Sequence, residues 1–268
     1  MAVALIGVLA SPLAAQLRQR GFRGFGFGEL RKATPEDFDG KFHFCRLAYG
    51  YDPRGDGSNW SVDFPRADIN LSQRLSELTN TDVGRRADGE PKYLLVELTD
   101  PELFNCGFVM MTEVGAASIN ADEAKNLRAY VEKGGFIWAD DFWGTYAWQW
   151  WEAQLRKALP ANEFPIVDLT PDHPLYHQVF NVKETPQIPN IGFWIGTGGE
   201  TSERGTDSAV VHTRAVLDSH GRIMVLMTHN TDLGDSFERE GEDAGYFQTM
   251  SVPGYAFGID VLVYALTH

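Results

Sequence analysis

The feature that constrains the fold most is a well-marked helix followed at once by a short apolar strand. Asn120 and Glu123 have the spacing of a capping box, which predicts the start of a helix. Two glycines at 134–135 predict its end, because glycine readily adopts the left-handed conformation that closes helices. The next four residues, 136–139, are all apolar, and so short a run predicts a strand buried on both faces. The buried face of the helix would consist of Ala124, Leu127, Tyr130 and Val131.

The same alternation of apolar runs and helical patterns extends along the chain. Further strands are predicted over residues 42–49, 93–96, 108–111, 209–211 and 223–227. Further helices are predicted over residues 70–78, over a segment that ends at Pro160, and over residues 255–266. Strands that alternate with helices usually pair in parallel and are covered on both faces. The pattern therefore predicts an α/β fold with a mainly parallel central sheet.

Length and composition set the domain count and exclude several classes of protein. A chain of 268 residues can form one large domain or two small ones, and no linker or repeat divides this one. We expect a single α/β domain over residues 42–268, preceded by a flexible lead-in over residues 16–41 that is rich in Gly, Arg and Phe. A hydrophobic content of 43% argues against intrinsic disorder. The net charge of −14 argues against general nucleic-acid binding and against a polybasic membrane tether.

The N-terminus suggests export. Residues 1–15 carry no charged side chain, and the apolar run from Ala2 to Ala10 suits the core of a signal peptide. A small-residue cleavage site follows at Ala14-Ala15, although a basic region before the run is missing. We expect residues 1–15 to be a signal peptide and the mature protein to be periplasmic or secreted; an apolar N-terminal strand or helix is the alternative. No later stretch has the length and apolarity of a transmembrane helix, so the mature form is not expected to span a membrane.

The chain has two cysteines, Cys45 and Cys106. In an exported protein they could form a disulfide bond. Cys45 falls within a predicted buried strand, however, and no C-x-x-C motif is present. We therefore expect Cys45 to be a small core residue.

The densest group of polar residues lies between Trp60 and Arg74, at the entrance to a predicted helix. In a binding site, Trp60 would stack on a polar ligand, and Arg66 and Arg74 would clamp it through paired hydrogen bonds. The candidate ligand-binding residues of this segment are Trp60, Asp63, Arg66, Asp68, Asn70 and Arg74. The alternative is a structural network in which Asp68 or Asn70 caps the helix and both arginines pair with Asp63.

Asp140 and Asp141 form the second candidate site, at the carboxyl end of a predicted central strand. Ligands of open α/β sheets bind beside these strand ends, so the two carboxylates could hold a divalent cation or sugar hydroxyls. They could equally cap the next helix, whose N-terminal dipole favours negative charge. The two roles are compatible, because both place the acids at the same spot.

The histidines give a weaker signal. His173 and His177 have helical spacing, but the neighbouring prolines interrupt any helix. A metal site built from Asp141, His173 and His229 is conceivable, yet it has no recognisable ligand spacing. We therefore expect no cofactor, with a divalent metal as the alternative. The acidic stretch at 235–243 is predicted to be a solvated loop, although Asp232 and Asp235 could border the same cleft as Asp141.

Several segments together resemble a bacterial family named domain of unknown function 4159. They are FCRLAYG at 44–50, WSVDFPRADINL from Trp60, the run from Leu127 through Gly134-Gly135-Phe136 to Asp140-Asp141, DHPLY at 172–176 and the closing segment 258–265. The resemblance covers roughly residues 42–266. It implies a flavodoxin-like three-layer sandwich related to class I glutamine amidotransferases, and proteins that are exported or membrane-anchored. By that analogy Asp140 and Asp141 occupy the turn of the catalytic cysteine, so glutaminase activity is not expected.

Function is constrained mainly by what is absent. The chain has no G-x-S-x-G, H-E-x-x-H or P-loop motif and no complete dinucleotide-binding fingerprint. The first hypothesis is an exported, non-catalytic module of the cell envelope that binds a small polar ligand or a protein partner. The alternative is a hydrolase of a carbohydrate or amide, metal-dependent or not, with Asp140, Asp141 and His173 as catalytic candidates. A structural subunit of an envelope complex is the third.

Overall fold

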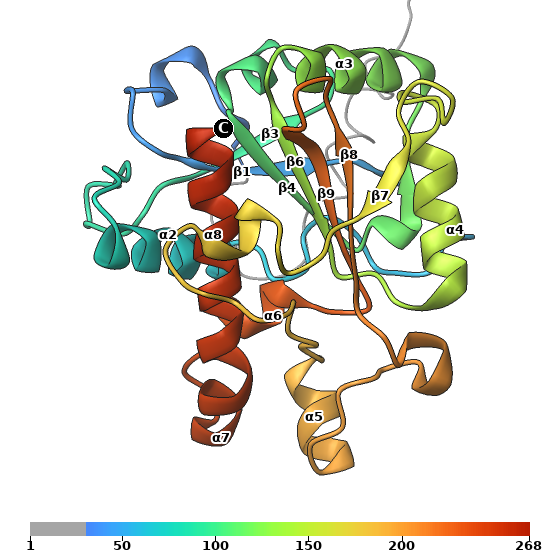
Figure 1. The fold of residues 1–268 in the computed structure, drawn as a ribbon. Helices are drawn as coiled ribbons and strands as arrows, with labels where there is room; N and C mark the ends of the chain where they lie inside the picture. The colour runs from blue at the N-terminus through green and yellow to red at the C-terminus, as the bar shows by residue number, and fades with distance from the viewer. Residues whose placement is uncertain (1–30) are drawn as a thin grey trace, which may run out of the picture. The chain divides into compact units, whose positions relative to one another are not determined.

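The computed structural model describes residues 31–268, and its helices and strands are arranged around one central sheet (Figure 1). The five parallel strands of this sheet are, in spatial order, β3 (Tyr93–Glu97), β1 (Phe44–Ala48), β4 (Phe108–Thr112), β6 (Phe136–Asp140) and β9 (Ile223–His229). Two antiparallel strands extend it beyond β9, namely β8 (His212–Leu217) and β7 (Ile166–Asp168). A separate ribbon pairs β2 (Gly50–Tyr51) with β5 (Ala117–Ser118). The predicted α/β fold with a mainly parallel sheet is confirmed.

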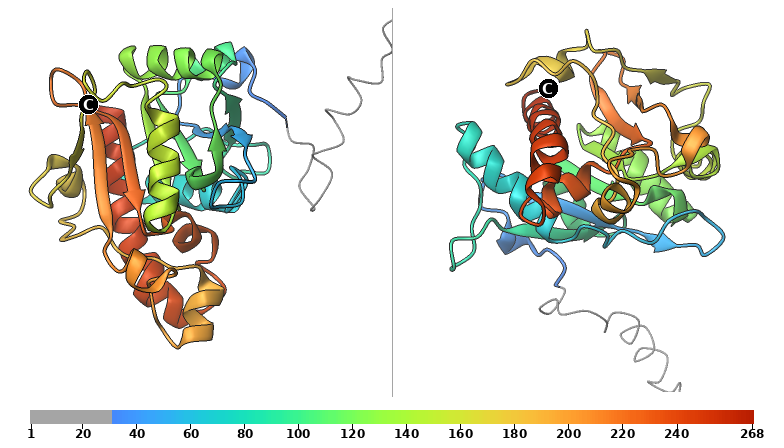
Figure 2. Two further views of the ribbon diagram at one scale, coloured as in Figure 1. Left: turned by 90° about the vertical axis from the view of Figure 1, so that its right-hand side faces the viewer. Right: turned by 90° about the horizontal axis from the view of Figure 1, so that it is seen from below.

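Helices cover both faces of the sheet, which gives the three layers visible in Figures 1 and 2. One face carries α2 (Arg66–Leu78) and α8 (Val252–Thr267), and the other carries α3 (Ala121–Glu132) and α4 (Gly144–Leu155). Shorter helices lie towards the carboxyl ends of the parallel strands: α5 (Ile191–Thr197), α6 (Leu233–Glu238), α7 (Ala244–Tyr246) and the π-helical turn η7 (Phe247–Ser251). Single 3₁₀ turns connect other elements: η2 (Pro35–Asp37), η3 (Pro101–Asn105), η4 (Val114–Ala116), η5 (Pro174–His177) and η6 (Gly205–Ser208).

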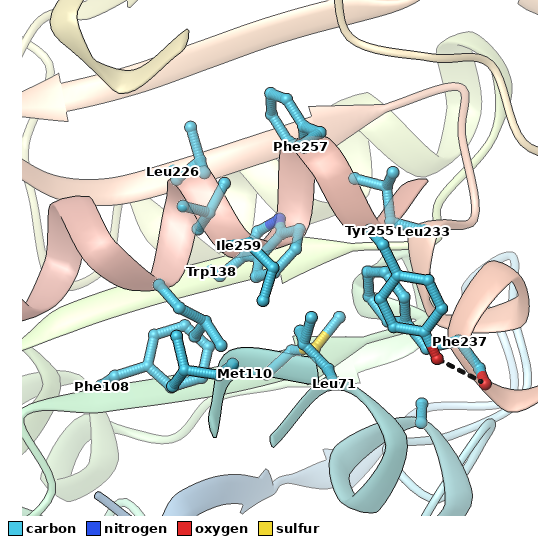
Figure 3. Packing of buried hydrophobic residues seen from close by; sticks show 14 of the residues in the cluster. Leu71, Phe108, Met110, Trp138, Leu226, Leu233, Phe237, Tyr255, Phe257 and Ile259 are labelled. Atoms are coloured by element: carbon cyan, nitrogen blue, oxygen red, sulfur yellow. Dashed lines mark hydrogen bonds between the residues drawn. The ribbon is translucent and has the colours of Figure 1, made fainter. Parts of the chain in front are cut away.

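An extended apolar core lies between the sheet and the layer of α2 and α8. Figure 3 shows Trp138 of β6 and Phe108 of β4 packed beneath Phe257 and Ile259 of α8. Trp138 is completely buried, and its indole N–H donates to Thr228 Oγ1 at 2.9 Å. Strands β1, β4, β6 and β9 are buried along their whole length because helices cover them on both sides.

Three details differ from the sequence-based expectations. Residues 209–211 form no strand; pairing begins only at His212. Strand β7 was not foreseen, because this edge strand is partly exposed and lacks an apolar run. The expected signal peptide and the lead-in up to residue 30 lie outside the described residues. The end of the lead-in already packs on the domain, since Ala33 N donates to Leu95 O of β3 at 2.8 Å.

Cys45 and Cys106 form a disulfide bond, with their Cα atoms 6.2 Å apart. The expectation that Cys45 is simply a core residue is therefore wrong. The reason lies in the strand order: β1 and β4 are neighbours, and their register places Cys45 opposite Val109. Cys106, just before β4, is thereby brought within bonding distance.

The helical stretch Ala244–Thr267 is, by length and composition alone, apolar enough to cross a membrane. The predicted helix over 255–266 was too short to show this, because the stretch includes α7 and η7. In this fold 61% of its most apolar window is buried. Core helices of globular proteins pass the same test, so the stretch is weak support for a membrane span.

Candidate functional site

The carboxyl ends of the parallel strands lie in the lower part of Figure 1 and face the viewer in the right-hand view of Figure 2. A cluster of buried acids lies at this edge of the sheet. Asp63 comes from the loop before α2, Asp141 directly follows β6, and Asp232 lies between β9 and α6. One carboxylate oxygen from each of the three lies within 4.8 Å of the other two. The residues are 6%, 5% and 3% exposed, respectively. We call Asp63, Asp141 and Asp232 the carboxylate cluster.

The backbone at this edge adopts an unfavourable conformation at four positions. Asp63, Glu113, Asp141 and Asn230 have φ values of 62°, 55°, 55° and 66°, and they are the only non-glycine residues with positive φ in residues 31–268. Residues other than glycine adopt this left-handed backbone conformation at a cost of about 1 kcal/mol or more. All four residues lie in loops that follow parallel strands. Such strain concentrates at functional sites, and here it coincides with the buried acids.

The cluster is electrostatically uncompensated. Burial raises the pKa of each of its three carboxyl groups well above the ordinary value, and neighbouring acids add to the effect. For Asp141 the largest contribution after burial comes from Glu113, and for Asp232 it comes from Asp141. No lysine or arginine from Lys32 to His268 forms an ion pair with any member of the cluster. Buried charges are normally paired or bound to metals, so this arrangement calls for a positively charged ligand.

The nearest buried cation is already committed elsewhere. Arg46, in β1, is completely buried and forms an ion pair with Asp68 of α2. Its remaining Nη1 donates to Thr112 Oγ1 at 2.9 Å. Arg46 lowers the pKa of Asp63 only as a more distant charge, which burial and the neighbouring acids outweigh.

Asp140 lies beneath the cluster and has a structural role. It is completely buried and accepts hydrogen bonds from Thr228 Oγ1 at 2.5 Å and from the backbone N–H groups of Leu233 and Gly234 at 2.9 and 3.2 Å. These bonds tie the end of β6 to the start of α6. Burial raises the pKa of Asp140 to about 7, although the hydrogen bonds oppose the shift.

Glu113, the acid next to Asp141, is less buried than the three residues of the carboxylate cluster. It follows β4, is only partly buried, and burial raises its pKa to about 7 against the effect of a hydrogen bond from the Ser58 backbone. A carboxyl group with such a pKa exchanges protons near neutral pH.

The structure brings only part of the predicted Trp60–Arg74 site to this edge. Asp63 is in the cluster, and Asp68 lies beneath it as the partner of Arg46. Trp60 is 4% exposed and packs against Phe64, so it offers no face for stacking.

The predicted structural network is also different from the observed one. Arg66 pairs with Glu90 at 3.0 Å, and Arg74 pairs with Glu77 and Glu240 at 2.8 and 3.0 Å, so neither arginine reaches Asp63. Asn70 donates to Phe237 O at 2.8 Å. Neither Asp68 nor Asn70 caps α2, because the chain enters that helix through Pro65. Glu77 lies on the same helix as Arg74, but Glu90 and Glu240 come from loops whose positions the sequence pattern does not predict.

Asp140 and Asp141 do not cap α4 either. At the start of α4, Gly144 N donates instead to Asn230 Oδ1 at 2.8 Å, and Thr145 N donates to Asp207 Oδ2 at 2.9 Å. Asp141 accepts from Trp143 Nε1 at 3.0 Å. These caps come from segments distant in sequence, so local spacing could not reveal them.

The histidines do not join the acids. His173 packs on Tyr264, whose hydroxyl accepts from Ile223 N at the start of β9, the end opposite to the cluster. His229 directs Nε2–H to Gly144 O at 3.0 Å, and its other nitrogen faces Arg214. The conceivable metal set of Asp141, His173 and His229 is therefore not assembled, and His173 cannot act with Asp140 or Asp141.

Sequence reasoning named Asp141 and Asp63 but placed them in separate groups, and it raised Asp232 and Asp235 only as bordering residues. Glu113, Asn230 and Arg46 were missed. For Glu113 and Asn230 the one signal in the sequence is that each follows an apolar run.

A groove of about 570 Å³ opens beside the same edge, between the loop at 180–188 and the start of α8. Its wall contains Ile188, whose carbonyl accepts from Asp232 N at 2.8 Å. The lining residues are Phe180, Asn181, Val182, Lys183, Glu184, Pro186, Gln187, Ile188, Thr249, Met250, Pro253 and Ala256. Cavities that bind small molecules have comparable volumes.

Comparison with known proteins identifies a family without an assigned activity. No curated protein matches the chain. A family model, described as Domain of unknown function (DUF4159), matches residues 43–266. This match spans the sheet, both helical layers and every acid of the site, and the chain therefore belongs to the DUF4159 family.

Proposed function

We propose that this protein is an exported ligand-binding module of the cell envelope that takes a small polar ligand at the carboxyl edge of its sheet. The observation that carries the proposal is the coincidence, at one place, of left-handed non-glycine residues with buried acids that lack a cationic partner. Each of these features lowers the stability of the folded state. Features of this kind that converge on one site are typical of function.

The strand order supports the location of the site. Numbered along the chain, the parallel strands have the order 2-1-3-4-5, with β1 first, β3 second and β4 third. Doubly wound sheets with this order bind ligands outside the carboxyl ends of the strands, where the order reverses. Here that point lies between β1 and β4. Asp63 enters from the loop that follows β1 and β2, and Glu113 directly follows β4.

We also infer kinship with the class I glutamine amidotransferase-like proteins, which the three layers and the sheet order support. Glutaminase chemistry needs a thiolate on the turn after the central strand. This chain has Asp140 and Asp141 at that turn, and both cysteines are joined in the disulfide. The proposed function is therefore binding and not glutamine hydrolysis.

Two observations support export. The disulfide between Cys45 and Cys106 is of a kind that persists mainly in oxidising compartments. The uncharged, apolar run near the N-terminus suits a signal peptide.

A hydrolase of a carbohydrate or amide is the second candidate function. It is favoured by Glu113, a partly exposed carboxyl group whose pKa of about 7 fits a general acid or base beside Asp141. A hydrolase would lose turnover in Glu113→Gln without losing ligand affinity, whereas a binding module has no turnover to lose.

The experiment that tests the proposal compares the stability of the full chain with that of Asp141→Asn, in the presence of a chelator at about pH 8. Asparagine can keep the hydrogen bond from Trp143 while it removes the uncompensated charge. If the cluster serves binding, the variant has a higher free energy of unfolding than the wild type. Asp172→Asn, at an exposed position, is the control and leaves stability unchanged. A less stable Asp141→Asn would show that the charge holds the fold together, and the proposal would fail.

A further inference from the structure

We propose that the carboxylate cluster holds a divalent cation, with Ca²⁺ as the best-fitting ion, through one oxygen each of Asp63, Asp141 and Asp232. The inference rests on the proposed function of the carboxyl edge and names the chemistry of its ligand. Carboxylate oxygens are the ligands that hard divalent cations prefer.

The geometry of the three oxygens fits an ion without rearrangement of the chain. A Ca²⁺ ion binds oxygen at about 2.4 Å, so that opposite ligands lie about 4.8 Å apart. All three cluster oxygens lie within that separation of one another. Mg²⁺ binds at about 2.0–2.1 Å in a strict octahedron, which demands more exact ligand positions. The flexible coordination of Ca²⁺ tolerates the arrangement as it stands.

Asp63 gives an independent sign that a ligand belongs here. It is 94% buried, and its Oδ2 atom has no hydrogen-bond partner among the described residues. Oδ2 lies against Gly234, at the start of α6, where a side chain larger than hydrogen would overlap it. A buried carboxylate oxygen without a partner is rare in folded proteins and carries a penalty that a bound cation would remove.

The other two acids each keep an oxygen available. Asp141 uses one oxygen to accept from Trp143 Nε1 at 3.0 Å, and Asp232 uses one to accept from Asp235 N at 2.8 Å. The structure shows no hydrogen bond to the second oxygen of either residue within 31–268. Carboxylates that bind metal ions commonly accept a hydrogen bond of this kind, which fixes the orientation of the side chain.

A neighbouring group of acids does not qualify as a second site. Asp63, Asp235 and Glu238 also bring three oxygens within 4.8 Å of one another. Arg239, however, contacts Glu238 at 2.7 Å and Asp235 at 3.3 Å, and Asp235 also accepts from Ile191 N. This group already has its cation, so we assign the ion to the carboxylate cluster alone.

The test is a calorimetric titration of Ca²⁺ into the chelator-treated full chain, with Asp63→Asn and Asp232→Asn as variants and Asp172→Asn as the control. Asparagine at 232 keeps the cap on Asp235 N, and asparagine at 63 breaks no hydrogen bond, so both variants are expected to fold. We expect one ion per chain, at least about 10-fold weaker binding in each cluster variant, and unchanged binding in the control.

Two results would overturn the inference: no binding of Ca²⁺, Mg²⁺ or Mn²⁺ at about 10 mM, or binding that both cluster variants retain unchanged. If no metal ion binds but Asp141→Asn is still more stable than the wild type, the proposed function stands and the ligand is an organic cation. Loss of that stability gain would instead refute the proposed function.

Discussion

Asp140 allows the electrostatic account to be tested quantitatively. In Asp140→Asn one amide oxygen can accept from the N–H groups of Leu233 and Gly234, while the amide nitrogen donates to Thr228 Oγ1. The hydroxyl of Thr228 can then donate to Ala139 O, which lies 3.3 Å away. The substitution therefore removes the charge and preserves the hydrogen bonds.

The magnitude follows from the pKa of Asp140, which burial raises from 3.8 to about 7. A carboxyl group whose pKa is higher in the folded state than in the unfolded state favours unfolding. This penalty grows as the pH rises from the unfolded-state pKa of 3.8 to the folded-state pKa of about 7. At about 1.4 kcal/mol per pKa unit, the penalty reaches about 4 kcal/mol above the folded-state pKa. It is less than about 1 kcal/mol at about pH 4.

The assay is urea unfolding of the wild type and Asp140→Asn, followed by tryptophan fluorescence from about pH 4 to about pH 8 with chelator present. We expect the free energy of unfolding of the variant, relative to the wild type, to increase with pH by about 3–4 kcal/mol over this range. The charge of Asp140 also raises the pKa of Asp63, Asp141 and Asp232, so its removal relieves these acids as well and changes the stability in the same direction. A difference that does not change with pH, or a variant that is less stable at about pH 8, would refute the reasoning.

Two further predictions concern the disulfide and the loop beside the cluster. Replacement of both Cys45 and Cys106 by Ala removes a cross-link between residues 61 positions apart in the sequence. The free energy of unfolding, measured in urea, should fall by about 4 kcal/mol. A loss below about 1 kcal/mol would contradict the presence of the disulfide. Gly234→Ala should weaken Ca²⁺ binding about 10-fold, because the new methyl group displaces Asp63 Oδ2; equal affinity in a titration would show that Asp63 is not a ligand.

The sequence predicted what local interactions determine. The capping box of α3 forms as expected, with Asn120 accepting from Glu123 N and the Glu123 carboxylate accepting from Asn120 N. The strand after it, β6, ends at Asp140. These elements depend on contacts between residues a few positions apart, which the sequence pattern displays directly.

The site depended on the order of the strands, which the sequence pattern does not display. Asp63 and Asp232 come from distant segments and meet only because β1, β4, β6 and β9 lie side by side. Asp68 has the position of a helix cap, yet its partner is Arg46 in β1. The disulfide was misjudged for the same reason, because the pairing of Cys45 with Cys106 requires β1 beside β4.

The most direct test of the central claim is an anomalous difference map from a crystal of the full chain soaked in Mn²⁺, which takes the same oxygen ligands as Ca²⁺. We predict a peak about 2.1–2.5 Å from carboxylate oxygens of Asp63, Asp141 and Asp232. A peak only at other acids, or none at the cluster, would contradict the assignment of this edge as a cation site.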